Sequence, residues 1–361
     1  MSEENNTPVQ PVNPPPTEKA PVRHDAAADT LPTVSASPHI RSHDTSTGIM
    51  LDVIIALIPA GIASVALFGP RSLAVIALSV MSCLLFEYVS RRVMKRNNTL
   101  HDLSAVVTGI LLAFNLPSSI PLWMVPIGAL VAIVVVKQFF GGIGQNFVNP
   151  ALMGRIILMV SFPTAMSSWP AQYKWGAAAD AVSSATPLAG LSAVFKGGID
   201  GADFSQFPSY LQMLFGERGG CLGETCAAAL LLGLLYLLVR RVISPIIPCV
   251  FVGTVGVFML AASHGSIPFT LYNILSGGLL LGAIFMATDY STSPLTSKGK
   301  FIYALGCGII TSVIRLYGSL PEGVSFAIIL MNILTPLIDR ATKPKPFGYV
   351  KERRTKEAKA E

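Results

Sequence analysis

Apolar runs, broken by short polar or proline-containing stretches, dominate the chain from residue 48 onward. A helix that crosses a bilayer needs about 20 apolar residues, and the runs are about that long. The pattern therefore predicts an all-α integral membrane protein with about ten transmembrane helices. The third and fifth predicted helices, at residues 101–116 and 148–163, are short, which is typical of discontinuous helices. We expect the helices at residues 48–68, 72–90, 101–116, 121–140, 148–163, 221–239, 243–262, 267–287, 301–317 and 323–338.

The two ends of the chain differ in composition from the apolar region. Residues 1–36 are rich in Pro, Ser, Thr, Asn and Glu and have no apolar stretch long enough for a signal peptide, so we expect a disordered cytoplasmic tail. Residues 340–361 form a basic cytoplasmic tail. Between the tails we expect a first five-helix membrane half at 37–163, a non-cytoplasmic segment at 164–220 and a second five-helix membrane half at 221–339.

The composition agrees with a lipid environment. Of the 361 residues, 52% are hydrophobic and only 13% are charged, whereas a soluble domain usually has about 25% charged residues. The formal net charge is +6, and short basic clusters between apolar runs fit loop anchoring better than nucleic-acid binding. The five cysteines lack a CxxC spacing, so we predict no metal site.

Positively charged residues predict the orientation in the membrane. Lys and Arg beside membrane helices prefer the cytoplasm, and here they follow alternate helices. We therefore expect both termini in the cytoplasm, with the connections near Gly69, Pro117, Ser263 and Gly318 outside. The basic residues that mark the cytoplasmic side are Arg91, Arg92, Lys95, Arg96, Lys137, Arg240, Arg241, Lys298, Lys300 and those of the tail that begins at Arg340.

The longest connection runs from about Ser161 to Gly220, and its mixed polar composition places it outside the membrane. Connections longer than about 15 residues usually have a function. A weak internal similarity also relates residues 101–122 to residues 272–295. The two copies begin on opposite sides of the membrane, so we expect two inverted halves, as in many transporters.

A short polar motif at residues 180–188 carries the clearest candidate chemistry. Its sequence is DAVSSATPL, in which the Thr186 hydroxyl can form a phosphoester, and the small residues before it leave room for a bulky group. Pro187 stiffens the turn. The alternative is an ordinary Ser/Thr turn.

The motif resembles the D-x-x-[ST]-G-A-T sequence at which a flavin transferase attaches FMN, through its phosphate, to threonine. That sequence occurs in the family that includes the RnfD component of Rnf complexes and the NqrB component of the sodium-pumping NADH:quinone reductase. The resemblance implies that Thr186 bears the flavin, and that Asp180, Ser183 and Ala185 occupy the other motif positions. Ser184 stands where the family usually has glycine.

The resemblance extends from about residue 37 to residue 339, because further segments look like those of the same family in the same order. It implies ten helices in two inverted halves, distantly similar to urea transporters, in the bacterial cytoplasmic (inner) membrane, with the flavin segment on the outer face. Among these segments are SPHIRS, SAVVTGILLAFNLP, NFVNPALMGR, CLGETCAAALLLGLLYLL, SGGLLLGAIFMATDYSTSPLTSKGK and PEGVSFAIILMNILTPLID.

The function implied is electron transfer through covalent FMN, in a complex that couples ferredoxin:NAD oxidoreduction to translocation of Na⁺ or H⁺. The chain has no nicotinamide fingerprint and no iron–sulfur cysteine set, so partner subunits must supply those functions. The alternatives are a passive channel or secondary transporter for a small polar solute, and a scaffold that holds partners together.

Ionisable residues within the apolar region are a second signal, because a charge in hydrocarbon is costly. The candidates are Asp52, Glu87, Asp102, Arg155, Glu224, Asp289 and Arg315. We expect three of them, Asp102, Asp289 and Arg315, to be exposed at the interface or to cap helices.

The remaining acidic candidates have their own expected roles. Asp52 and Glu224 open their helices, and a capping role is favoured over a role in an ion path. Glu87 lies near the end of its helix, where we expect it to reach the interface or to pair with Arg91.

Uncharged polar and small residues complete the candidates. Four amides have two interpretations: they bind a second, noncovalent flavin or an ion, or they join helices by hydrogen bonds, which we favour. These are Asn115, Asn146, Asn149 and Asn332. The small-residue runs Ser276-Gly-Gly and Gly282-Ala283 indicate close helix packing.

Overall fold

The computed structural model describes residues 45–169, 172–173, 186–198, 204, 207–318 and 322–344. The predicted tail at 1–36 and most of that at 340–361 lie outside the described residues. Everything described below belongs to one compact unit, Asp44–Glu361. Its described residues form helices and connecting turns, with no β-strand among them, as the apolar pattern predicted.

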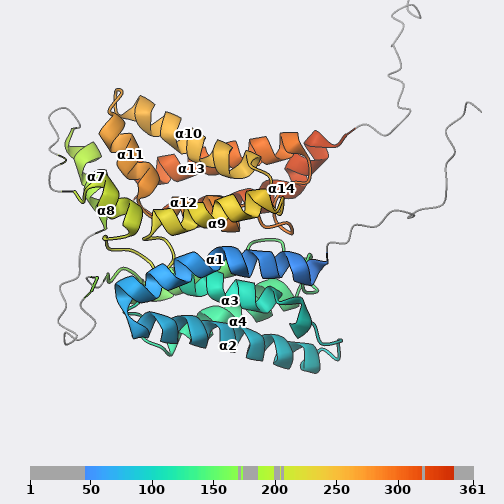
Figure 1. Cartoon of the computed structure of the whole chain (residues 1–361). Helices are drawn as coiled ribbons and strands as arrows, with labels where there is room; N and C mark the ends of the chain where they lie inside the picture. Colours follow the sequence, from blue (N-terminus) through green and yellow to red (C-terminus); the bar gives the residue numbers. More distant parts are fainter. Residues whose placement is uncertain are drawn as a thin grey trace, which may run out of the picture. The chain divides into compact units, whose positions relative to one another are not determined.

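The first helix group comprises the elements before residue 167. Figure 1 shows its helices α1 to α4 lying together. The fourth apolar segment changes from α-helix to π-helix partway along its length. The elements are α1 (Ser46–Phe68), α2 (Pro70–Val93), the 3₁₀ turn η2 (Leu100–Asp102), α3 (Ser104–Phe114), α4 (Met124–Leu130), the π-helix η3 (Val131–Gln138), α5 (Pro150–Ser161) and α6 (Pro163–Met166).

The second helix group begins after residue 226, and two short helices precede it, α7 (Pro187–Gly197) and α8 (Tyr210–Phe215). Figure 1 shows α7 and α8 beside α11, at one end of the group. The group consists of α9 (Ala227–Val239), α10 (Ile246–Ala262), α11 (Ile267–Leu275), α12 (Leu279–Leu281), the π-helix η5 (Gly282–Met286), α13 (Ser297–Tyr317) and α14 (Val324–Thr342).

Four helices, α1, α2, α13 and α14, are long and apolar enough to cross a membrane. A fifth span is possible if α11 and the segment Leu279–Met286, bent by 62° relative to each other, are counted as one. Five further apolar helices in the described residues have 10 to 17 residues: α3, α4 with η3, α5, α9 and α10. The helical, apolar character predicted from the sequence is therefore confirmed.

The two helix groups meet where α1 packs against α9 (Figure 1). Gly233 of α9 permits the approach, since a Cβ atom there would lie 2.5 Å from the carbonyl oxygen of Ala56 and 2.8 Å from Phe285 Cζ. Small residues let membrane helices come close in this way. A buried hydrogen bond from Ser64 Oγ to the carbonyl of Leu222, 2.5 Å long, adds a polar link.

Candidate functional site

Thr186, the predicted flavin-bearing residue, immediately precedes helix α7. Its side-chain oxygen accepts a long hydrogen bond of 3.4 Å from the backbone N–H of Ala189, so Thr186 is the N-cap of the helix. Pro187 occupies the first helical position, where its missing N–H costs nothing. The other predicted motif residues, Asp180, Ser183, Ser184 and Ala185, lie outside the described residues.

Helix α7 is held against α11 and α13 by apolar contacts. Near its start, Leu188 is buried against Gly277. Near its end, the ring of Phe195 packs 6.3 Å from that of Phe269 and meets Tyr317 edge-on at 5.8 Å. Helix α7, of which Thr186 is the N-cap, therefore lies over the break between α11 and α12.

The break itself contains Ser276, Gly277 and Gly278. Gly277 has a φ of +64°, in the left-handed region that favours glycine. We predicted a continuous helix over residues 267–287, and the run instead interrupts it. The predicted close packing is present at the run, since a Cβ atom at Gly277 would lie 3.2 Å from Leu188 Cδ2. The packing prediction also holds at Gly282, because a Cβ atom added there would lie only 2.5 Å from Val324 Cγ1.

Two buried arginines hold the end of α11 at the break. Arg315 donates from Nη1 to the carbonyl of Asn273 at 2.5 Å and from Nη2 to that of Ser276 at 3.1 Å. Arg218 donates from Nη1 to the carbonyl of Leu275. These carbonyls have no helical partner, and they carry the negative end of the helix dipole, which a cation stabilises.

A carboxylate lies on the other side of the break. Glu224 Oε1 accepts a 3.0 Å hydrogen bond from the backbone N–H of Cys221, while its buried Oε2 has no hydrogen-bond partner. Oε2 faces Gly278, the residue before α12, since a Cβ there would lie 3.1 Å from it. The negative charge thus lies at the start of α12, which is the positive end of its dipole.

A third arginine, Arg155 of α5, joins this group from the first helix group. It donates from Nη1 to Asn115 Oδ1 at 2.7 Å and pairs through Nη2 with Glu322, and Nη2 lies 3.7 Å from Cys221 Sγ. Cys221, Glu224 and Glu322 have ligand atoms within 4.8 Å of one another, a spacing suitable for a metal ion. The guanidinium of Arg155 already compensates charge there, which makes a further cation less favourable.

Sequence reasoning did not single out Arg218 or Glu322. Both lie in connections rather than in apolar runs. The other ionisable candidates were selected because they lie within apolar runs, where a charge is costly. Each nevertheless has a partner at the break or near it, Leu275 for Arg218 and Arg155 for Glu322.

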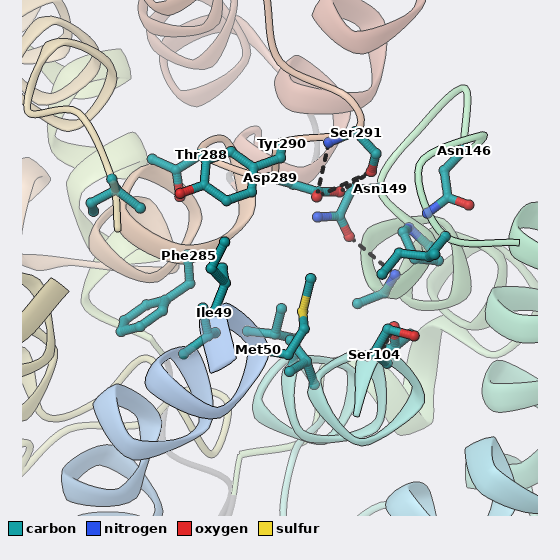
Figure 2. A pocket seen from close by; sticks show the side chains of 18 of the residues that line it. Ile49, Met50, Ser104, Asn146, Asn149, Phe285, Thr288, Asp289, Tyr290 and Ser291 are labelled. Atoms are coloured by element: carbon teal, nitrogen blue, oxygen red, sulfur yellow. Dashed lines mark hydrogen bonds between the residues drawn. The ribbon is translucent and has the colours of Figure 1, made fainter. Parts of the chain in front are cut away.

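A pocket between the two helix groups is a second candidate site, and Figure 2 shows it from close by. Its cavity volume is about 90 Å³, and the space around the cavity is partly open to solvent. Both π-helices border it, η3 through Lys137 and η5 through Phe285. Because π-helices occur frequently at functional sites, we treat the pocket as a candidate site.

Three polar residues of the pocket, Asp289, Ser291 and Asn149, lie close together in its wall (Figure 2). Asp289 accepts hydrogen bonds from Ser291 Oγ at 3.0 Å and from Thr292 Oγ1 at 3.4 Å. Burial raises the pKa of the Asp289 carboxyl, although these hydrogen bonds lower it in part. Asn146 Oδ1 is buried without a partner, so it is available to a donor on a ligand. Asn149 lies beside them.

Lys137 of η3, which borders the pocket, forms a fully buried ion pair with Glu87 of α2. Lys137 Nζ lies 2.7 Å from Glu87 Oε2. Lys137 also donates to Ser104 Oγ at 2.6 Å, and Thr99 Oγ1 donates to Glu87 Oε1 at 2.8 Å. The prediction that Glu87 reaches the interface or pairs with Arg91 was wrong. A lysine from another helix satisfies it inside the protein, where a paired charge costs far less than an isolated one.

Three candidates were expected at interfaces or caps. Asp102 lies in the turn η2, where its Oδ1 accepts from the backbone N–H of Ser104 at 3.0 Å, but the N-cap position of α3 is Leu103 and has no side-chain cap. Asp289 instead stabilises the turn after η5 through Ser291. Arg315 is only 2% exposed, so its expected interfacial exposure was wrong; it caps the end of another helix, α11.

The two acidic residues expected to cap their own helices have other partners. Asp52 lies inside α1, accepts a 2.8 Å hydrogen bond from Tyr236 and pairs with Arg240 at 3.2 Å, which joins α1 to α9. Glu224 interacts with Cys221 and not with the first turn of α9. Both capping predictions were wrong: the partners of Asp52 come from α9, and Glu224 accepts from Cys221 in the turn before α9.

The favoured interpretation of the amides, that they join helices, is confirmed at three positions. Asn115 accepts from Arg155, and Asn149 donates from Nδ2 to the carbonyl of Met286 at 3.3 Å. The amide of Asn332 lies 2.6 Å from Tyr303 Oη. Asn149 also caps α5 through Oδ1. Among the four, only Asn146, which lines the pocket, has a buried oxygen without a hydrogen-bond partner.

The sequence matches the model of the NQR2, RnfD, RnfE family over residues 33–348. It is 47% identical over 330 residues to the D subunit of the Na(+)-translocating ferredoxin:NAD(+) oxidoreductase complex of Acetobacterium woodii, covering 91% of this chain and 98% of that one. It is 43% identical to the proton-translocating counterpart of Clostridium ljungdahlii, covering 88% and 96%. The D subunit of the ion-translocating oxidoreductase complex of Stutzerimonas stutzeri is 38% identical, covering 83% and 91%.

Proposed function

The chain belongs to the NQR2, RnfD, RnfE family, as a subunit of an ion-translocating oxidoreductase complex, and we propose that it carries electrons through FMN bound covalently to Thr186. The complex would couple ferredoxin:NAD oxidoreduction to translocation of Na⁺ or H⁺, the two ions that the relatives' names give. The other subunits of that complex would supply and accept the electrons, and a flavin transferase would attach the cofactor.

The observation that carries the proposal is the position of Thr186 at the N-terminus of the 11-residue helix α7. A phosphodiester on its hydroxyl would bring negative charge to the positive end of the helix dipole, where free backbone N–H groups favour anions. Thr186 is half-buried, so its hydroxyl has access from outside α7. FMN supplies the electron-transfer chemistry when bound; the protein supplies its position and electrostatic surroundings.

We further propose ten transmembrane spans in two inverted halves, with both termini cytoplasmic and residues 164–220 on the outer face of the inner membrane. The positions of Lys and Arg support this orientation. The broken helix α11–α12 supports the inverted arrangement, because discontinuous helices near the interface of the halves are typical of such folds.

We propose that a second, noncovalent flavin binds in the pocket shown in Figure 2. Apolar side chains such as Met50 and Phe285 suit a flat ring system, and the polar wall suits its nitrogen and oxygen edge. Asn146, whose buried Oδ1 has no hydrogen-bond partner, offers an amide to a ligand in this pocket. Ligand there would bridge α1 and η5, one element from each helix group.

The test is denaturing gel electrophoresis of the chain purified from its native complex. Covalent flavin remains on the chain and fluoresces under ultraviolet light, and mass spectrometry of the peptide with Thr186 should show the added mass of FMN. A passive channel or secondary transporter, the alternative from the sequence, would run as a non-fluorescent band. That result would overturn the proposal.

A further inference from the structure

Arg91 of α2 is a buried cation for which the described part of the chain provides no acceptor. It is one of five buried Lys and Arg side chains there, and it is 9% exposed. Arg91 makes no ion pair and no side-chain hydrogen bond with a described residue, and its Nε is buried. The other four donate to carboxylate or carbonyl oxygens of the protein; they are Lys137, Arg155, Arg218 and Arg315.

The protein groups nearest in sequence that could neutralise Arg91 already have partners. Glu87, one turn earlier on α2, accepts from Lys137 Nζ at 2.7 Å and from Thr99 Oγ1 at 2.8 Å. The carbonyl oxygens of the last turn of α2 accept from the backbone N–H groups of residues 94–96. A buried charge without a counter-charge is strongly unfavourable. The guanidinium of Arg91 is therefore available to an anion from outside the chain.

A glycine loop that follows η3 lies against this guanidinium. Gly142 has a φ of +107°, and a Cβ atom there would overlap Arg91 Nη2 and lie 3.2 Å from Arg91 Cζ. The N–H of Gly142 donates to the carbonyl of Lys137 at 2.9 Å, which fixes the loop to the end of η3.

A second buried polar side chain at the same end of η3 also lacks a partner. Gln138 is fully buried, and within the described residues neither its Nε2 nor its Oε1 has a hydrogen-bond partner. Its carbonyl accepts from the N–H of Gly141 at 3.2 Å, so Gln138 belongs to the base of the glycine loop. Buried polar groups nearly always have a partner. Two unsatisfied side chains, Arg91 and Gln138, at the two sides of this loop indicate a polar ligand.

The position of Arg91 along α2 indicates where the ligand comes from. Helix α2 is a candidate membrane span of 24 residues, so its length is about 36 Å, whereas a hydrocarbon core is about 30 Å thick. The last turn, with Arg91, therefore lies at the level of lipid head groups. Exposed aromatic rings lie beside the glycine loop, Phe140 and Phe147, with centroids 4.6 Å apart. Exposed cations follow Arg91: Arg92, Lys95 and Arg96.

We propose that Arg91 and the glycine loop at residues 141–144 bind the phosphate of an anionic phospholipid. The planar guanidinium offers paired N–H donors to two phosphate oxygens. The acyl chains would lie along the apolar face of α2, where Leu85 and Val89 are exposed. A zwitterionic lipid fits less well, because its ammonium group would meet the exposed cations that follow Arg91. The proposal does not involve the flavin, so it is tested independently of the proposed function.

The experiment is native mass spectrometry of the whole complex in detergent, titrated with phosphatidylglycerol. Arg91→Gln should weaken binding of this lipid roughly tenfold, because hydrogen bonds to a charged phosphate are lost. The matched control is Arg92→Gln, which removes the same charge one residue further along. Arg92 is exposed and donates to Tyr88 Oη at 3.1 Å, so its replacement should leave the affinity nearly unchanged.

A second pair of variants tests the site without removing a charge. Gly142→Ala places a Cβ against the guanidinium and should weaken lipid binding as Arg91→Gln does. Gly144→Ala is its control: Gly144 also has a positive φ, +80°, so the backbone strain is comparable, but a Cβ there meets nothing within 4 Å. If Arg91→Gln fails to assemble, this pair gives the answer.

Three outcomes would overturn the proposal. The first is equal affinity for phosphatidylglycerol in the unmodified complex and in both Arg91→Gln and Gly142→Ala. The second is phosphatidylcholine binding as tightly as phosphatidylglycerol in the unmodified complex. The third is stabilisation of the complex by inorganic phosphate that depends on Arg91, without binding of phosphatidylglycerol, which would assign the site to a free anion.

Discussion

The Thr186 hydroxyl has two possible uses at the scale of a single residue. It accepts a hydrogen bond from Ala189 N–H, and it is the predicted point of flavin attachment. At 3.4 Å the cap hydrogen bond is long, and losing an N-cap typically costs about 1 kcal/mol. Flavin attachment, by contrast, requires the hydroxyl oxygen and is lost completely without it. A substitution that removes the hydroxyl should therefore abolish attachment while changing stability only slightly.

Thr186→Val should abolish covalent FMN while leaving the fold nearly intact. Valine keeps the β-branched shape and replaces the hydroxyl with a methyl group, so no phosphoester can form. The loss of the cap should lower stability by about 1 kcal/mol. In-gel fluorescence and peptide mass measure the flavin, and the amount of variant in membranes measures folding.

Ser184→Gly is the control for this experiment. It restores the family pattern and should preserve flavin attachment. A Val variant that inserts normally but still carries the mass of FMN would remove Thr186 from the mechanism. Attachment at Ser183 or Ser184 would then be the remaining explanation, and the peptide mass would identify it.

The buried pair Lys137–Glu87 allows a test of stability. Lys137→Met leaves the Glu87 carboxylate without its cation, which typically costs about 3 to 5 kcal/mol in a buried pair. The double variant Lys137→Met/Glu87→Gln removes both charges and should recover part of the loss. We expect the melting temperature of the detergent-purified complex to fall in the order wild type, double variant, single variant. A single variant as stable as the wild type would show that the pair contributes little.

The same residues show what a sequence can reveal about individual side chains. The hydrogen bond of Asp102 to the start of α3 is local, because its partner, Ser104, is two positions away. The partner of Glu87 is 50 positions away, so only the packing of α2 against η3 reveals it. Arg315 is a similar case, since its acceptors belong to a separate helix.

At the scale of elements, the break between α11 and α12 was misread for a specific reason. Glycine at residues 277 and 278 fits close packing and a break equally well, and the apolar run continues through both. The sign of φ at Gly277 distinguishes them. Gly282, in the same range, does pack closely, against Val324. The local amino-acid composition therefore predicted where the helical segment lies, but not that the helix is broken.

The contact between α1 and α9 gives a prediction for an element. Gly233→Val should force the helices apart, because even the Cβ would lie 2.5 Å from the Ala56 carbonyl. Overpacking of this kind typically costs about 1 to 3 kcal/mol. Gly253→Val is the matched control, since a Cβ there meets nothing within 4 Å. Melting temperature measures both, and equal values would show that α1 and α9 tolerate separation.

At the scale of the whole molecule, the apolar runs predicted where helices lie, since length and composition are local properties. A described helix occurs in each of the ten predicted ranges. The charges that join the helix groups, such as Arg155 with Glu322, were not predictable as pairs because each partner is remote in sequence. The flavin motif stays a prediction at all five positions, and four of them lie outside the described residues.

The last prediction concerns the orientation of the whole chain in the membrane. Lys and Arg follow alternate apolar runs, which predicts both termini in the cytoplasm and residues 164–220 outside. A reporter fused after Asp339 should be active in the cytoplasm, and one inserted near residue 200 should be active only outside. Between these points the proposal has five spans, an odd number, so the two reporters must lie on opposite sides. Reporters on the same side would require an even number of spans there, and the broken helix α11–α12 would then be re-entrant rather than a span.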